Sequence, residues 1–146
     1  MIHAQNHKVV AELPAAAVGS TATTTLTIDT LGYDHASVTV LRAGNATTVF
    51  ANVLKVEESD DNSSYSNVTA LVGGGTGGFT IPAASSSTST TNIVKMDIDC
   101  KAKKRYLKVS YTPGVSATIG IVARLGRGEV SPVTATEANV AAIVKG

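Results

Sequence analysis

Apolar and polar residues alternate along much of this chain, most regularly between Ile93 and Leu125. Successive side chains of a strand point to opposite faces, so a period of two predicts strands with one buried face. Polar residues 99–104 and the turn at 112–114 divide this stretch into three runs, which favours an antiparallel meander of three adjacent strands. The residues expected to face inward are Val94, Met96, Ile98, Leu107, Val109, Tyr111, Ile119, Ile121, Ala123 and Leu125.

The N-terminal half of the chain adds shorter strand patterns, separated by Gly, Pro, Asn and Ser. The expected strands are 8–13, 21–29, 36–42, 47–58 and 65–72. The total of about eight short strands predicts an all-β fold, an antiparallel β-sandwich, and favours the eight-stranded jelly roll. An immunoglobulin-like sandwich is the alternative, although its Cys…Trp…Cys pattern is absent.

A chain of 146 residues fits one domain, here residues 1–146. Residues 1–13 are expected to form an extended N-terminal arm that includes a short strand. Residues 131–146 are expected to form a C-terminal arm or a short helix. Val140, Ile143 and Val144 have helical spacing there, and Thr134 or Thr136 fits the N-cap position.

Composition narrows the class of protein. Charged residues make up only 16% of the chain, against about 25% in an average globular domain, which suits a subunit of a larger assembly. The net charge of +1 predicts no attraction to nucleic acid or to an anionic membrane. No apolar run approaches the length of a membrane-spanning helix, and the N-terminus does not resemble a signal peptide, so synthesis in the cytoplasm is expected.

The strongest charge feature is a basic cluster in the loop after residue 99. It consists of Lys101, Lys103, Lys104 and Arg105. Three interpretations are open: a charged loop that keeps a sheet edge from pairing, a surface for a protein partner, or a phosphate contact. Nucleic acid is the weakest of the three, because Tyr106 is the only aromatic residue nearby on which a base could stack.

Other candidate sites lack part of their pattern. His3 and His7 have the spacing of helical metal ligands, but no third ligand accompanies them. The acidic run 57–62 does not match a calcium-binding EF-hand loop, and the glycine run 73–78 is not followed by the Lys of a phosphate-binding loop. We therefore predict no metal and no cofactor.

Catalytic chemistry is also not indicated. The three histidines lie in the first quarter of the chain, and no Gly-x-Ser-x-Gly nucleophile motif occurs. Cys100 is the only cysteine, which excludes an internal disulfide, and it is expected to pack near a strand end. We predict that the protein is not an enzyme.

Four segments carry a resemblance to a known group of proteins. They are DTLGYD at 29–34, VLKVEESDD at 53–61, KRYL at 104–107 and ATEA at 135–138. These segments resemble small proteins encoded by tailed bacteriophages, some of which are capsid cement (decoration) proteins. The resemblance implies a jelly roll that sits as a homotrimer on the outside of the phage head. It implies the major capsid protein and sister subunits as partners, and the virion as location. On this reading the apolar residues Val140, Ile143 and Val144 would bury their side chains on a neighbouring molecule.

Two functions follow as hypotheses. The first is a structural protein that reinforces the phage head. The second is a binding module on the head or tail that recognises host glycans through its loops. The scarcity of aromatic residues, 4% of the chain, argues against the second, since sugar sites commonly offer an aromatic platform.

Overall fold

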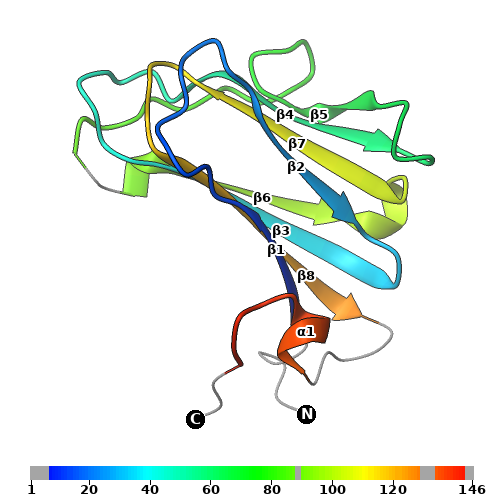
Figure 1. Cartoon of the computed structure of the whole chain (residues 1–146). Helices are drawn as coiled ribbons and strands as arrows, with labels where there is room; N and C mark the ends of the chain where they lie inside the picture. The colour runs from blue at the N-terminus through cyan, green and yellow to red at the C-terminus, as the bar shows by residue number, and fades with distance from the viewer. Residues whose placement is uncertain (1–6, 88–89, 129–133, 144–146) are drawn as a thin grey trace.

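The computed structural model describes residues 7–87, 90–128 and 134–143, and these residues form two facing β-sheets (Figure 1). Eight strands are present in the described residues, all pairing antiparallel, so the predicted all-β sandwich is confirmed. Their bounds are β1 His7–Glu12, β2 Thr24–Asp29, β3 Tyr33–Arg42, β4 Ala51–Ser59, β5 Ser66–Val72, β6 Ile93–Asp99, β7 Tyr106–Pro113 and β8 Ile119–Gly128.

The strand order is that of a jelly roll. One sheet has the order β1-β8-β3-β6 and the other β2-β7-β4-β5. The first strand therefore pairs with the last, the second with the seventh, the third with the sixth and the fourth with the fifth. A long hairpin rolled up across two sheets produces this pattern, whereas an immunoglobulin domain divides its strands differently. The jelly roll predicted from strand number is confirmed.

The predicted three-stranded meander is wrong. β6 lies in the first sheet, β7 in the second, and β8 returns to the first between β1 and β3. Alternation specifies which side chains face the core but not which strand is the neighbour, because crossing to the facing sheet buries the same side chains. The 100–105 linker, which contains a short 3-10 turn (η3, Cys100–Ala102), and the 114–118 linker make these crossings.

The core lies between the two sheets and includes inward residues expected from the alternation, such as Met96, Leu107 and Ile121. Two aromatic residues contribute: the Tyr111 hydroxyl donates to the Phe50 carbonyl at 2.9 Å, and the two rings lie 5.5 Å apart. The remainder is aliphatic and largely β-branched, which suits face-to-face sheet packing. The fully buried aliphatic side chains include Ile28, Val38, Val40, Leu54, Val56, Leu107, Val109, Ile121 and Leu125.

The chain ends are more closely integrated than the predicted arms. The short strand predicted within residues 1–13 is confirmed as β1, which pairs with β8 from His7–Gly126 to Glu12–Ile121, so this part of the segment belongs to the sheet. Continuous hydrogen bonding to a central strand holds it in the sheet. Residues 1–6 lie outside the described part of the chain.

Near the C-terminus the short helix is confirmed and the extended arm is not. Helix α1 spans Ala135–Ala138, and Thr134 caps it in a reciprocal capping box with Glu137. Asn139 then adopts a left-handed conformation, and its side-chain amide donates to the Val9 carbonyl at 2.7 Å. The segment therefore lies against β1 of its own sheet (Figure 1). Val140 and Ile143 are half-buried there, and Val144 lies outside the described residues.

The two-sheet core predicts a matched pair of effects on stability. Replacing Ile121, which is fully buried, by Ala should lower the free energy of unfolding by about 2–5 kcal/mol, through lost burial and a residual cavity. The same change at Ile93, which is 45% exposed on the outer face of that sheet, should cost less than about 0.5 kcal/mol. Urea denaturation of both variants measures the difference, and equal losses would contradict the assigned inward face.

Candidate functional site

Function in this fold is confined to the two ends of the sandwich and its two outer sheet faces. Successive strands run in opposite directions, so the linkers gather alternately at the two ends (Figure 1). One end carries short connections, at 30–32, 60–65 and 100–105, and we call it the short-loop end. The other carries the three longest, at 13–23, 43–50 and 73–92, together with the short 114–118 linker, and we call it the long-loop end.

The basic cluster lies at the short-loop end and is paired within the chain. Arg105 forms a two-pronged ion pair with Asp29 at the end of β2, with N–O distances of 3.0 and 2.8 Å. The Arg105 guanidinium lowers the pKa of the Asp29 carboxyl and also lies 4.8 Å from the centre of the Tyr106 ring. A planar guanidinium fits a carboxylate in this way, so Arg105 joins the β6–β7 linker to the β2–β3 turn.

The lysines of the basic cluster make similar contacts. Lys101 pairs with Asp34 at 3.1 Å, and Lys104 pairs with Asp60 at 3.0 Å. The Lys103 ammonium donates only to the neighbouring Ala102 carbonyl. Exposed pairs of this kind contribute little to stability, but they cancel most of the local positive charge. The arrangement favours the charged-loop interpretation of the basic cluster over a partner surface.

Carboxylate oxygens of the acidic run 57–62 accept hydrogen bonds from other groups of the same chain. Asp61 accepts hydrogen bonds from the Ser64 and Ser63 backbone N–H groups and from the Ser59 hydroxyl, at 2.8, 2.9 and 2.7 Å. These bonds, the Ser64 one foremost, lower the pKa of Asp61 to about 2. Within the described ranges, no group of three or more His, Cys, Asp or Glu residues is placed to hold a metal ion.

The glycine run 73–78 forms a tight turn with bonds to its own chain. Gly73 donates to the Leu54 carbonyl and Gly74 to the Phe79 carbonyl, each at 2.8 Å. A side chain at Gly78 would overlap the Val72 carbonyl, which explains why glycine is needed there. Because these amides are already paired, the turn does not form a phosphate cradle.

Arg42, at the long-loop end, was missed by the sequence analysis. Its side chain is only 3% exposed and donates to the Val49 carbonyl at 2.7 Å, and to the Asn45 side chain and the Thr47 carbonyl at 2.9 Å. This buried cation therefore organises the loop between β3 and β4. The alternation could have identified it, because Arg42 occupies the next inward position of the strand after Val38 and Val40.

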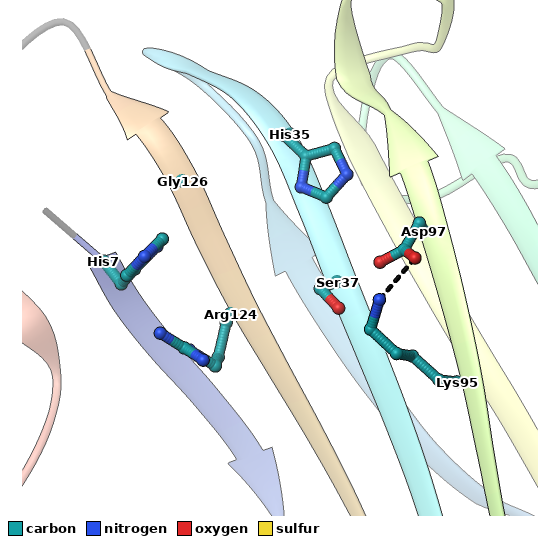
Figure 2. A pocket seen from close by; sticks show the side chains of 7 residues that line it. All are labelled: His7, His35, Ser37, Lys95, Asp97, Arg124 and Gly126. Carbon is teal, nitrogen blue, oxygen red and sulfur yellow. Dashed lines mark hydrogen bonds and ion pairs between the residues drawn. The ribbon is translucent and has the colours of Figure 1, made fainter. Parts of the chain in front are cut away.

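The outer face of the β1-β8-β3-β6 sheet contains a notch of about 260 Å³ (Figure 2). Its floor is Gly126 of β8, which pairs with His7 of β1 on one side and His35 of β3 on the other. A side chain at Gly126 would come within 3.0 Å of the His7 ring, so glycine leaves the space between the two imidazoles open. The lining residues are His7, His35, Ser37, Lys95, Asp97, Arg124 and Gly126.

Among the described residues, one of the two cations around this notch is paired with a carboxylate and the other is not. Lys95 forms an ion pair with Asp97 and is the main cause of the lowered pKa of that carboxyl, with a further contribution from the Ser37 hydroxyl (Figure 2). Arg124 has no carboxylate partner among the described residues. The His7 Nδ1 atom is shielded from solvent and has no hydrogen-bond partner in the described part of the chain. The notch thus offers an unpaired cation beside a polar atom that lacks a partner.

The notch brings a serine, a histidine and a carboxylate together, which sequence spacing did not predict. Ser37 and His35 lie on the same strand, and Asp97 lies on the neighbouring β6. The Ser37 hydroxyl is engaged with Asp97, and no hydrogen bond joins it to either imidazole in the described structure. These residues therefore do not form the nucleophile–base pair that acyl transfer requires. Burial raises the pKa of the Cys100 thiol to about 11, which keeps it protonated.

The opposite end of the same outer face is apolar. Leu13 is 69% exposed and lies over Gly120, where a side chain would come within 2.8 Å of the leucine. Leu41 and Ile93 pair across β3 and β6 in the neighbouring positions, and Ile93 is 45% exposed. We refer to Leu13, Leu41 and Ile93 as the apolar patch. Exposed apolar side chains gathered in one place are typical of binding surfaces.

Neither the family models nor the curated proteins compared with this chain include a match. Among the described residues, no helix is long and apolar enough to cross a membrane. The geometry of the surface is therefore the main support for a functional proposal.

We predict that Arg42 is more important for stability than any surface arginine of the same sheet. Arg42→Met leaves three acceptors at the long-loop end without their donor and should lower the free energy of unfolding by about 2–3 kcal/mol. Arg124→Met, on the outer face, should change it by less than about 0.5 kcal/mol. Thermal or urea unfolding tests the pair, and a stable Arg42→Met variant would contradict the role given to the buried cation.

The lowered pKa of Asp61 predicts a specific response to acid. Because the folded pKa of about 2 lies below the ordinary 3.8, the stability contributed by Asp61 is present above pH 3.8 and is lost as the pH falls through 2. Ser59→Ala removes one donor and should raise the carboxyl titration midpoint, as followed by ¹³C NMR. Ser63→Ala retains its backbone donor and should leave the midpoint unchanged. Equal midpoints in the Ser59→Ala variant and the wild type would contradict the assignment.

Proposed function

We propose that this protein is a capsid cement protein, which binds as a homotrimer to the outside of a tailed-phage head and stabilises the shell. The observation that carries the proposal is the outer face of the β1-β8-β3-β6 sheet. It combines an exposed apolar patch with a notch whose Arg124 has no carboxylate partner among the described residues, and the described groups around the notch do not form a nucleophile–base pair. Such a surface suits binding to another protein rather than a reaction.

The jelly roll and the resembling segments support the same proposal from a second direction. Three of the four segments meet at the short-loop end, where Asp29 pairs with Arg105 and Asp60 pairs with Lys104. The resemblance to phage cement proteins is therefore concentrated where linkers at one end of the scaffold contact each other. It supports a shared fold, and it leaves the binding surface to be found elsewhere on the molecule.

Stabilisation would operate by mass action. A subunit that binds the intact shell but not its dissociated parts shifts the equilibrium toward the shell, by about 2.7 kcal/mol per site at a free concentration 100 times the dissociation constant. No chemical step is needed. Synthesis would take place in the host cytoplasm, and the finished protein would lie on the virion exterior.

Glycan recognition is less well supported. All six aromatic residues of the chain lie in the described part, and none of them is fully exposed: Phe50 and Tyr111 are in the core, and the other four are half-buried. A flat, open aromatic ring is the usual platform for a sugar, so the loops lack the expected contact surface. No observation favours this alternative over the cement proposal.

The cement proposal predicts saturable binding to heads. Heads purified from a phage that encodes this chain, with the gene deleted, should take up the added protein in cosedimentation and should then resist heating to a higher temperature. Absence of cosedimentation by folded wild-type protein, at concentrations up to about 0.1 mM, a weak affinity by any standard, would contradict the proposal.

A further inference from the structure

On the outer face of the β2-β7-β4-β5 sheet, charged side chains already form ion pairs with one another. Glu57 of β4 forms ion pairs with Lys55 at 3.0 Å and with Lys108 of β7 at 3.2 Å. The Lys108 ammonium also lies 4.1 Å from the centre of the Tyr65 ring. The two lysines lower the pKa of Glu57 against the opposing effect of burial. Binding a partner here would disrupt contacts that the protein already makes.

At the short-loop end, charged side chains also form ion pairs within the chain. Of the four cations in the basic cluster, Lys101, Lys104 and Arg105 each have a carboxylate partner within 3.1 Å. An acidic partner would have to compete with these internal acids. Only Lys103 has no carboxylate partner within the described ranges. The basic cluster is therefore a weak candidate for a docking surface.

The notch on the β1-β8-β3-β6 sheet differs, because one of its cations has no carboxylate partner among the described residues. Lys95 neutralises Asp97, so Arg124, which has no carboxylate partner in the described ranges, gives the described lining of the notch a net positive charge even with both imidazoles neutral. Figure 2 shows the Arg124 guanidinium next to the His7 ring, with Gly126 between that pair and His35. A guanidinium presents its donors in a fork that matches a carboxylate. His7 adds a shielded nitrogen without a described partner.

The apolar patch lies at a fixed distance from the notch. Gly126 and Gly120 are six residues apart on β8, which at about 3.3 Å per residue corresponds to about 20 Å along the strand. Both points belong to one rigid sheet. A partner that contacts the whole face would therefore meet a cationic notch and an apolar patch about 20 Å apart.

We propose that the outer face of the β1-β8-β3-β6 sheet is the surface that docks on the shell, with a carboxylate side chain of the shell protein bound in the notch by the exposed Arg124. An apolar part of the shell surface then covers Leu13 and Ile93. Charge complementarity selects this occupant, because the notch is the one described surface site with an unpaired cation beside an unpartnered donor or acceptor. This inference rests on the proposed cement function.

The test compares binding of four variants to the same gene-deleted heads by cosedimentation. Arg124→Glu reverses the charge that holds the carboxylate, and its apparent affinity should fall at least about tenfold. Lys103→Glu makes the same charge change in the basic cluster and should bind like the wild type. Gly126→Ala places a methyl group against the His7 ring and should weaken binding, whereas Gly19→Ala, which meets nothing within 4 Å, should not.

The possible outcomes separate the two proposals. Wild-type binding with losses confined to Arg124→Glu and Gly126→Ala supports the docking face. Wild-type binding with a loss only in Lys103→Glu overturns it in favour of the basic cluster. Equal binding by all four variants also overturns it. If folded wild-type protein does not bind at all, the cement function fails, and the docking inference falls with it.

The notch can also be tested without the shell. Acetate added to ¹⁵N-labelled protein at constant ionic strength should shift the Arg124 side-chain resonance and the amide of Gly126 in a saturable manner, while chloride should not. The same titration of Arg124→Glu should show no such shifts. If acetate moves neither resonance in the wild type, or moves the Lys103 and Arg105 signals instead, the carboxylate site in the notch is refuted.

Discussion

Burial of every second side chain between two facing sheets is the constraint on which this structure depends. The inward positions of all eight strands are used for the core, from Ile28 in β2 to Leu125 in β8. Side chains that could meet another molecule are left only on the outer faces and at the two ends. The jelly-roll order then determines which distant segments share each of those surfaces.

Many charged residues on that surface already pair with other groups of the same chain. The short-loop end joins its linkers through ion pairs such as Arg105–Asp29, and the long-loop end is organised by the buried Arg42. Both arrangements stabilise connections between strands. The outer face with His7 and Arg124 is different, because its cation and its shielded imidazole nitrogen have no described partner. Polar groups without a described partner and exposed apolar residues on one sheet face are the best structural reason to place binding there.

Local alternation was sufficient to predict the strands and the inward residues, including Val109 and Ile121, because the period of two is a property of each strand alone. It could not predict the meander correctly, since the same pattern is buried whether β7 lies beside β6 or across from it. The notch could not be predicted from the sequence either. His7, His35 and Arg124 come together only through the pairing of β1 and β3 with β8, and these strands are far apart in the sequence. Arg42 alone left a local signal, as a cation on the apolar face of its strand.

The most direct test of the cement proposal is whether the protein occurs on a phage particle, and at which place. Immunogold labelling of purified virions, with antibody raised against the folded chain, should place gold over the whole surface of the head. Gold confined to the tail tip would contradict the cement function and return attention to host recognition. Particles without gold, from a lysate in which the protein is present and accessible to antibody, would contradict any role on the virion.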